Sequence, residues 1–407
     1  MSHSGELPAS LSALPEIEGL LEEAREDRAY AAAQSCVIHR GKMVHHSVHG
    51  STETGKSIDT QTLFDVASIT KMAVTTLSIA LLLKHQELRL ETYARRFFPT
   101  LDSRVTIREL LGHGSGLPAW EPLFMEAMSD PATAVIFPSN RQGAVRADIR
   151  AAAFVGSRER VVQRAASTAL GQHRGTRHYS DLGFILLGRI VEVVGSSSLD
   201  LFSKREIFEP LGLKGTRFFD LAEAEAPKDI EVACTGVTRP RPPVAGQEDL
   251  YEVASQPECP DPGEVDDDNA FAMGGVAGHA GLFSSAAEMA RLAWLLFEEL
   301  NGANHLGLGE SLRLFSEPDL RVVGPLRGLG FDLPAEADSS AGAHIGKGGP
   351  LGAIGHLGFT GCSLWLDRDR ELAVALLTNR VFPDRKRTEG IRLLRPRFHD
   401  AVVSVLA

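Results

Sequence analysis

The sequence predicts a mixed α/β fold of the α+β type, in which one antiparallel sheet is assembled from both ends of the chain around an inserted, mostly helical lobe. Two observations lead to this prediction. Strand-like segments lie within the first 50 residues and again between residues 328 and 378, and the stretch from residue 68 to about residue 208 has a mostly helical pattern. A chain of 407 residues with 43% hydrophobic composition is long enough for two or three lobes and a large core.

The first elements follow from hydrophobic periodicity. An amphipathic helix is expected from about Leu14 to Asp27. Two alternating segments come next, Ala31 to His39 and Met43 to His49, and their separation by Arg40-Gly41-Lys42 indicates a hairpin. After a loop, the apolar run from Met72 to Leu83 predicts a buried helix that the chain enters at Ser68.

The later elements are marked by capping signals and composition. Thr106 to Glu109 has the form of a capping box before a short helix ending at Gly112, and Asp181 to Val194 is apolar over a helical length. Arg239 to Asp268 is rich in proline and acid and is expected to be a long loop joining the lobes. Beyond it we expect a helix opened by Ser285 to Glu288 and running through Leu300, strands over Gly328 to Leu333, Gly355 to Thr360, Ser363 to Asp367 and Leu372 to Thr378, and a last helix near Glu389 to Leu406.

These elements divide the chain into two lobes. Residues 1–66 and 270–407 would form the sheet lobe, and residues 67–269 would form the mostly helical lobe, which includes the loop at about 239–268. We expect an active site at the interface between them.

Charge and cysteine content restrict the class of partner and the compartment. The net charge of −11 argues against nucleic acid or an anionic membrane surface and favours a small-molecule substrate. Met1 to Pro15 lacks the features of a secretory signal, and Ala73 to Leu83 is too short to span a bilayer. The four cysteines, Cys36, Cys234, Cys259 and Cys362, lack C-x-x-C spacing, which favours unpaired thiols and, with the other signals, a cytoplasmic location. The sequence does not specify the oligomeric state.

The tetrapeptide Ser68-Ile69-Thr70-Lys71 is the strongest catalytic signal. At the start of a helix, side chains three residues apart share one face, so an amine would lie within reach of a hydroxyl. A serine becomes a nucleophile when a neighbouring base and donors for the developing oxyanion are present. A helix N-terminus and burial both disfavour the protonated lysine, which would help Lys71 to act as the base.

Two further segments match what such an enzyme requires. Tyr179-Ser180-Asp181 lies in a polar turn at the head of an apolar helix, and His356 to Gly361 lies on a late strand where glycines permit close approach of a substrate. With Ser68 to Lys71, these strings resemble the serine β-lactamase and penicillin-binding-protein superfamily, whose signature combines S-x-x-K with S-D-N and K-T-G elements. The likeness is greatest to the class C β-lactamase-like esterase branch, which has Y-x-N and often H-x-G. It extends in the expected order over roughly residues 30 to 400 through Leu63 to Asp65, Leu110 to Pro118, Gly274 to Phe283 and Leu377 to Arg380.

The resemblance implies a β-lactamase/transpeptidase-like fold with a five-stranded sheet flanked by the terminal helices, and it implies residue roles. Ser68 would attack an acyl carbonyl to form an acyl-enzyme, with Lys71 and Tyr179 sharing proton transfer. The backbone N–H groups of Ser68 and Phe359 would form the oxyanion hole. No metal or other cofactor is implied.

Departures from the family pattern bear on the substrate. His356 and Leu357 stand where β-lactamases carry Lys-Thr, so a substrate carboxylate would be held less well beside Gly358. Asp181 stands in place of Asn, and it could pair with Lys71 or with a substrate amine, raising the pKa of either amine and giving Tyr179 more of the base role. We therefore expect a neutral or amine-bearing ester or amide. Esterase, amidase, D-aminopeptidase-like or weak β-lactamase activity fits, and efficient penicillinase activity does not.

Two other function classes stay open. A non-catalytic relative would use the same cleft to bind a ligand or to assemble with other chains, which the departures at Asp181 and Leu357 motivate. Gly50 to Ser57 fits the P-loop pattern G-x-x-x-x-G-K-S, which would predict a nucleotide binder. A P-loop must run directly into a helix, however, and the β-branched and polar Ile58 to Leu63 does not favour one.

The remaining polar clusters have structural interpretations. His45 and His46 should point to opposite faces of a strand, so a solvated hairpin that also carries His49 is favoured over a metal site. Asp266 to Asp268 is expected to be a solvated loop. His113 and His279 are expected to be hydrogen-bonded structural residues, and His279 is also a candidate for substrate contact because glycine-rich segments often line clefts. Arg380 could bind an anion or form a structural ion pair, and Cys362 is expected to be inert.

Overall fold

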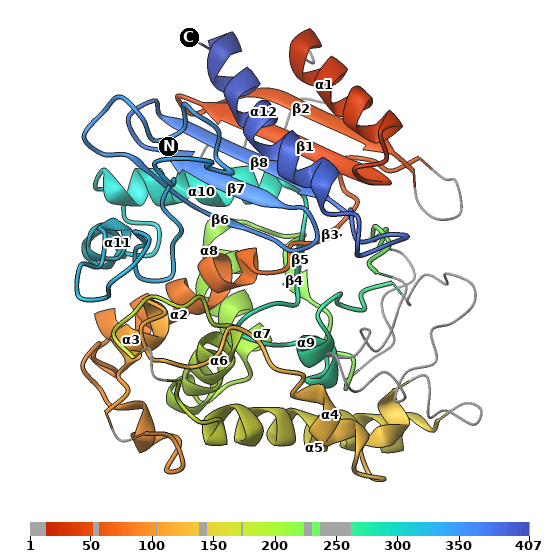
Figure 1. The fold of residues 1–407 in the computed structure, drawn as a ribbon, viewed down its shortest axis with the longest axis vertical. Helices are drawn as coiled ribbons and strands as arrows, with labels where there is room; N and C mark the ends of the chain where they lie inside the picture. The colour runs from red at the N-terminus through yellow and green to blue at the C-terminus, as the bar shows by residue number, and fades with distance from the viewer. Residues whose placement is uncertain are drawn as a thin grey trace.

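The chain folds around one antiparallel sheet built from its two ends, as the sequence predicts (Figure 1). The computed structural model describes residues 14–51, 57–102, 104–137, 145–171, 174–223, 230–236 and 262–406. The strand order is β2-β1-β8-β7-β6, and β6 is therefore an edge strand. The strands are β1 (Ala32–His39), β2 (Lys42–Gly50), β6 (Ala353–Leu357), β7 (Ser363–Asp367) and β8 (Leu372–Thr378). The mixed α/β fold class is confirmed.

The expected N-terminal hairpin is present. Arg40 and Gly41 connect β1 to β2, and both adopt positive φ, +50° and +76°. A turn with two left-handed residues matches the natural twist of two antiparallel strands, which is why glycine is favoured there.

Successive side chains along each strand point to opposite faces of the sheet, and both faces are apolar. The outer face is covered by α1 (Pro15–Glu26) and α12 (Glu389–Leu406), which pack against each other and against Val37, Trp365 and Val374. The inner face, with Cys36, packs on α10 (Ala286–Leu300) and joins the main core. Figure 1 shows the two terminal helices above the sheet and α10 beneath it. Both terminal helices and α10 were predicted from the sequence.

A mostly helical region lies below the sheet in Figure 1 and contains the elements between β2 and α10. A small second sheet, in the order β3-β5-β4, lies between this region and the main sheet.

The division of the chain into lobes at residues 67 and 269 stays a prediction. The elements are β3 (Phe64–Asp65), β4 (Arg217–Phe218), β5 (Leu282–Ser284), the π-helical turns η1 (Lys71–Thr76) and η5 (Lys204–Phe208), the 3₁₀ turns η2 (Ala94–Arg96) and η3 (Ala134–Ile136), and α2 (Leu77–Lys84), α3 (Ile107–Leu111), α4 (Phe124–Met128), α5 (Ala147–Ser167), α6 (Asp181–Gly195), α7 (Leu199–Ser203), α8 (Glu209–Leu211) and α9 (Asp268–Ala272), with α11 (Gly309–Ser316) following α10.

Several helices begin where their caps predicted. Thr106 and Glu109 form a reciprocal capping box at the start of α3, because each side chain bonds the other residue's backbone N–H. The Ser285 hydroxyl accepts from the Glu288 N–H at the start of α10, and the Ser180 hydroxyl accepts from the Gly183 N–H at the start of α6. These caps satisfy backbone donors that would otherwise lack partners.

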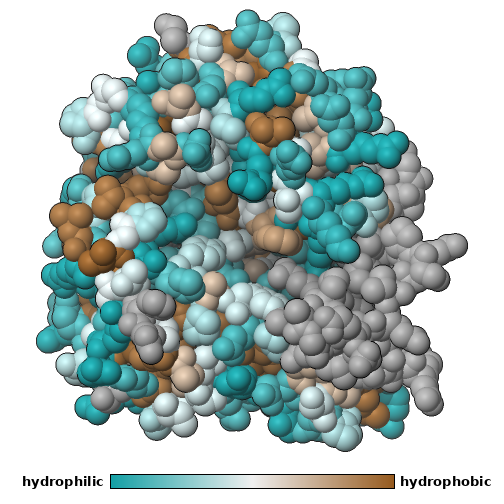
Figure 2. Space-filling model, in the orientation of Figure 1, coloured by the Kyte–Doolittle hydropathy of each residue, from teal (hydrophilic) through white to brown (hydrophobic). Residues whose placement is uncertain are grey.

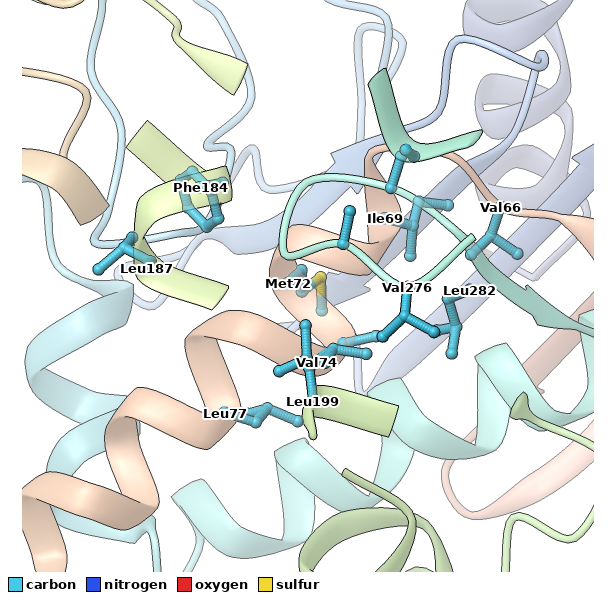
Figure 3. Packing of buried hydrophobic residues seen from close by; sticks show 14 of the residues in the cluster. Val66, Ile69, Met72, Val74, Leu77, Phe184, Leu187, Leu199, Val276 and Leu282 are labelled. Carbon is cyan, nitrogen blue, oxygen red and sulfur yellow. The ribbon is translucent and has the colours of Figure 1, made fainter. Parts of the chain in front are cut away.

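The segment after Ser68 runs through the middle of the molecule. Every side chain of η1 is buried, and Figure 3 shows Met72, Val74 and Leu77 among hydrophobic residues from other elements, including Phe184 and Val276. A helix that is buried on all sides is held by packing from several directions. The residues at its N-terminal end are therefore fixed in position.

Two strand predictions need correction. Residues 328–333 do not form a strand; the structure shows only isolated bridges there, between Arg327 and Asp332 and between Asp332 and Gly355. The reason is close packing at Gly330, which has a φ of +77° and lies so near η1 that a Cβ would meet the Thr76 hydroxyl. Strand β6 also ends at Leu357 instead of Thr360, because the chain turns at residues 358–361 with a bond from the Gly361 N–H to the Gly358 carbonyl.

The acidic run from Asp266 to Asp268 is buried, so the expectation of a solvated loop is wrong. Arg385 pairs with both Asp266 and Asp268, and the Asp267 carboxylate caps α9 by accepting from the Ala270 N–H. Ion pairing and capping offset the cost of burying these charges, which composition alone did not indicate. Residues 237–261, which include most of the expected loop at 239–268, lie outside the described residues.

The hairpin histidines are less solvated than expected. His45 is fully buried beneath α1, where its Nε2 lies 2.7 Å from the Ser35 hydroxyl, and burial lowers its pKa to about 4. The packing of α1 on β2 explains the difference, because no sequence pattern placed that helix over the edge strand.

The cysteines also differ from expectation. Cys36 and Cys362 are free and buried, whereas Cys234 is disulfide-bonded, so the prediction of unpaired thiols is wrong for Cys234. Disulfide formation depends on the spatial approach of two Cβ atoms and needs no particular sequence spacing. The cysteines therefore no longer support a reducing compartment. Cys259 lies outside the described residues.

The P-loop hypothesis lacks its structural context. Thr52 to Lys56 lie outside the described residues, and the chain from Ser57 to Leu63 forms no helix. The helix N-terminus that a P-loop requires directly after the motif is therefore absent from the described residues 57–63.

One observation bears on membrane insertion. Within the described ranges, no single helix is long and apolar enough to cross a bilayer. The helix α6 and the segment Leu199–Leu211 meet the length and composition criteria as a pair, with a bend of 73° between them.

Candidate active site

Ser68 lies where the small sheet passes into the central helix. The Asp65 carboxylate accepts from the Ala67 N–H at 2.8 Å, and Ala67 takes a left-handed conformation with a φ of +48°. Such a conformation is uncommon for alanine and is maintained here by the surrounding bonds. The Ser68 carbonyl then accepts from the Lys71 N–H at 3.0 Å, which starts the first turn. Ser68 is half-buried, while its neighbours on both sides are buried.

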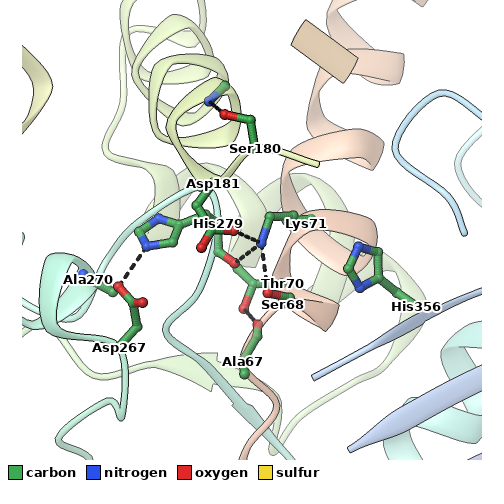
Figure 4. A network of polar contacts seen from close by, with 12 residues as sticks. Ala67, Ser68, Thr70, Lys71, Ser180, Asp181, Asp267, Ala270, His279 and His356 are labelled. Carbon is green, nitrogen blue, oxygen red and sulfur yellow. Dashed lines mark hydrogen bonds and ion pairs between the residues drawn. The ribbon is translucent and has the colours of Figure 1, made fainter. Parts of the chain in front are cut away.

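Lys71 brings a buried amine to the serine. Its Nζ lies 2.8 Å from the Ser68 Oγ, 2.8 Å from an oxygen of Asp181 and 3.0 Å from the His279 carbonyl (Figure 4). Burial alone would lower the pKa of Lys71, but attraction to Asp181 and interaction with Tyr179 outweigh it, so the net pKa is raised. In this state the lysine is an ammonium group that donates a hydrogen bond to Ser68.

Tyr179 approaches the same point from the turn before α6. His113 holds this turn, because its Nδ1 accepts from the Ser180 N–H at 3.0 Å and its ring lies 4.6 Å from the Tyr179 ring. Burial raises the pKa of the Tyr179 phenol, the nearby Asp181 raises it further, and Lys71 and contact with Ser68 oppose the rise. The predicted structural role of His113 as a hydrogen-bonding residue agrees with this geometry.

The late strand closes the site from the sheet side. His356 is buried on the inner face with its ring 6.1 Å from that of Tyr179, and burial lowers its pKa to about 4. Gly358 packs so closely on the chain before Ser68 that a Cβ would lie 2.5 Å from the Val66 carbonyl. The Thr360 hydroxyl donates to the Asp65 carbonyl at 2.7 Å. These contacts fix the end of β6 beside the nucleophile.

Ser68, Lys71, Tyr179 and the end of β6 thus meet at one site, in a chain that is similar to known proteins over most of its length. The Beta-lactamase family model matches residues 17–396. The chain belongs to the Beta-lactamase family.

Relatives in this family cover most of the chain. The N-acetylmuramyl-L-alanine amidase of Bacillus subtilis (strain 168) is 26% identical over 376 residues, which is 86% of this chain and 77% of the relative. The octameric penicillin-binding protein homologue from Pyrococcus abyssi superposes with a TM-score of 0.67 at 20% identity, over 97% of this chain and 78% of that one. EstCE1, a hydrolase with promiscuous acyltransferase activity, superposes with a TM-score of 0.66 at 19% identity, over 95% and 97% of the two chains. The two solved structures share the fold.

The side chains of two predicted substrate-binding residues, Leu357 and His279, contact other parts of the fold. Leu357 lies on the outer face of β6 and packs against the core under α1 and α12, because side chains alternate along a strand and His356 occupies the inner face. The His279 ring is buried and bonds Asp267 at 2.8 Å, and it is the His279 backbone carbonyl that reaches Lys71 (Figure 4). Substrate contact by the side chains of His279, His356, Leu357 and Asp181, and by the backbone at Gly358, stays a prediction.

The contacts around the predicted oxyanion hole involve the Phe359 carbonyl. Phe359 is 45% exposed, and its carbonyl accepts from the Arg380 Nε at 2.7 Å. Arg380 therefore stabilises the turn after β6, which is a structural role. The assignment of the Ser68 and Phe359 N–H groups to an oxyanion stays a prediction.

Sequence reasoning missed two charged residues at the site. The Arg327 guanidinium lies 4.9 Å from the Tyr179 ring centroid, and Arg327 pairs with Asp332, whose carboxylate is 3.8 Å from the His356 Nε2. Asp332 lies in the segment predicted as a strand and Arg327 directly precedes it, where a charged pair gives no signal of its own. Arg327 approaches Tyr179 and Asp332 approaches His356 on either side of the turn at Gly330, so only the folded chain reveals these contacts.

Proposed function

We propose that this protein is a serine hydrolase that forms an acyl-enzyme on Ser68 and hydrolyses a small ester or amide. The observation that carries the proposal is the position of the Lys71 Nζ, which is buried within 2.8 Å of both the Ser68 Oγ and Asp181. A nucleophile in contact with a group that can exchange its proton, itself oriented by a third residue, is the arrangement that activates serine.

The charge state of the cluster favours Tyr179 as the base in acylation. Because the pKa of Lys71 is raised, its ammonium form donates to Ser68 and has no lone pair with which to accept a proton. Because the pKa of Tyr179 is also raised, its phenolate forms as the pH rises, and that phenolate would take the proton of Ser68 while Lys71 stabilises the negative charge. Proton return through the same pair would release the leaving group, and a water activated by the pair would hydrolyse the acyl-enzyme.

The site favours a neutral acyl group. His356 is uncharged at neutral pH because burial lowers its pKa to about 4, so it offers no fixed cation for a carboxylate. Asp181 is already paired with Lys71, and Arg327 is paired with Asp332, so neither charge is available without breaking an ion pair. The similarity to an amidase and to EstCE1, a hydrolase with promiscuous acyltransferase activity, supports amides and esters as the substrate class.

Covalent labelling tests the nucleophile. Intact-mass analysis after treatment with a fluorophosphonate should show one adduct on the native protein and none on Ser68→Ala. Ser78→Ala is the matched control, because Ser78 lies on the same helical segment, is fully buried and has no hydrogen-bond partner for its hydroxyl among the described residues. Labelling that persists in Ser68→Ala would overturn the assignment.

A substrate panel then separates the activities. We expect turnover of short-chain p-nitrophenyl esters or D-amino-acid amides to exceed that of nitrocefin. A non-catalytic binding protein would turn over none of these compounds and would lack the Ser68 adduct. The cytoplasmic location expected from the sequence stays a prediction.

A further inference from the structure

Among the described residues, the buried Arg395 donates hydrogen bonds only to backbone carbonyls of one turn. It projects from α12, is 9% exposed, and donates to the carbonyls of Gly358, Gly361 at 3.2 Å and Cys362 at 2.8 Å. No acidic side chain in the described part of the chain forms an ion pair with it. The turn that it binds joins β6 to β7 and carries Phe359.

Such an arginine is costly to bury without a carboxylate partner. Burial lowers the pKa of Arg395 to about 10, so the side chain still carries its charge at neutral pH. Its charge is directed at the turn from the outer face of the sheet, which α12 covers (Figure 1). A role in orienting that turn would explain why a charged group is retained in a largely apolar layer.

Peptide geometry connects Arg395 to the site on the opposite side of the turn. The Gly358 carbonyl and the Phe359 N–H belong to one planar peptide group, and that group is trans, so the two point in opposite directions. The Gly358 N–H donates to the Cys362 carbonyl at 2.7 Å, which places the bonded side of Gly358 toward β7. Because β6 is the edge strand, the Phe359 N–H is directed away from β7 and toward the open edge.

We propose that Arg395 is a positioning residue for the oxyanion hole, which it aligns by fixing the Gly358–Phe359 peptide. A cation on the carbonyl side also polarises the peptide group and makes its N–H a stronger donor. Preorganised donors aimed at a developing charge are among the largest contributions to catalysis. The inference rests on the proposed function, because it gives Arg395 a role in the same acyl transfer.

The test compares Arg395→Met with Arg395→Lys, and Arg392→Met is the matched control because Arg392 is an exposed arginine one turn earlier on the same helix. With a p-nitrophenyl ester, Arg395→Met should lower kcat about 10- to 100-fold with KM little changed, since loss of an oxyanion donor acts in the transition state. Arg395→Lys keeps the charge but cannot reach all three carbonyls, so its kcat should fall between those of the methionine variant and the native protein. Rates are expressed per active site titrated with fluorophosphonate, which removes the contribution of unfolded protein.

Phenylboronic acid supplies a second measurement, since its tetrahedral serine adduct places an oxygen where the oxyanion would lie. We expect its affinity to fall in Arg395→Met by about the same factor as kcat/KM, as for a transition-state analogue. Equal kcat and boronate affinity in Arg395→Met and Arg392→Met would overturn the proposal. If Arg395→Met does not fold, native-like kcat and boronate affinity in Arg395→Lys would overturn it instead. Failure of the native protein to label at Ser68 would reject the proposed function, which is a different result.

Discussion

Ser68 lies between two halves of the site that are built from different groups. On the helical side, three side chains with ionisable groups, Lys71, Tyr179 and Asp181, surround the hydroxyl. On the sheet side, the turn at residues 358–362 presents backbone, and side chains from elsewhere hold its carbonyls. The first half is suited to moving protons, and the second is suited to stabilising negative charge.

The two halves also differ in how they respond to change. On the helical side, the fully buried Lys71 pairs with the partly buried Asp181, so removing either charge leaves the other without its partner. The sheet side depends on close backbone approach, as at Gly358, so adding volume there disturbs it most. Substitutions that act on one half alone can therefore separate the two contributions.

The largest effect is expected on the helical side from Lys71→Met. It removes the cation that neutralises Asp181 and stabilises a phenolate at Tyr179. Breaking a buried pair costs about 3–5 kcal/mol of unfolding free energy, measurable by urea denaturation. The rate of ester hydrolysis should fall at least about 10²-fold, the lower range for loss of an acid–base group.

A double substitution separates the expected loss of stability from the expected loss of activity. Lys71→Met with Asp181→Asn removes both charges, so it should regain part of the lost stability while activity stays low. Lys84→Met is the control, because Lys84 is on the same helix but donates to the Leu306 carbonyl. Native-like hydrolysis by Lys71→Met would remove lysine from the mechanism.

A smaller effect is expected on the sheet side from Gly358→Ala. Its Cβ would lie 2.5 Å from the Val66 carbonyl, so β6 and the chain before Ser68 must move apart. Overpacking of this kind costs about 1–3 kcal/mol of unfolding free energy. The kcat should fall about 10²-fold if the shift displaces one oxyanion donor, and KM should change less.

Gly19→Ala is the matched glycine control. A Cβ at Gly19, within α1, meets nothing within 4 Å, so this variant should be as active as the native protein and slightly more stable. Unchanged kcat in a folded Gly358→Ala variant would show that the distance between β6 and Val66 does not control the reaction.

The two segments of the helical half could be predicted from local pattern, whereas their convergence at Ser68 was implied by the family resemblance. Ser68 and Lys71 lie one turn apart, and the Ser180 cap places Tyr179 and Asp181 at the start of α6. Hydrophobic periodicity likewise identified the hairpin, both terminal helices and the strands β7 and β8. Each of these features depends on residues close together in the chain.

The sheet half could not be predicted in the same way. Arg395 is 37 residues from Gly358, and nothing in its helical context indicates that it reaches that carbonyl. The burial of Asp266 depends on Arg385, 119 residues away, and the turn at Gly330 depends on its packing against Thr76. Long-range contacts of this kind give no periodic signal and appear only in the folded chain.

The smallest change in maximal rate is expected from Asp181→Asn, which alters a charge on the helical side without altering the shape of the side chain. Asp181 raises the pKa of both Lys71 and Tyr179. Without its negative charge both pKa values fall, so the basic form needed to accept the proton of Ser68 is populated at lower pH. The alkaline rise in kcat/KM should therefore shift toward lower pH, as measured by ester hydrolysis across the pH range.

Asp267→Asn is the matched control for this shift. It removes a neighbouring acid that bonds His279 instead of Lys71, and asparagine retains the ability to cap α9. Its pH profile should coincide with that of the native protein. A pH profile for Asp181→Asn that stays in place, or moves toward higher pH, would contradict this prediction. It would show that the Lys71–Asp181 ion pair does not set the protonation state of the base. Proton transfer would then have to be assigned to groups outside this pair.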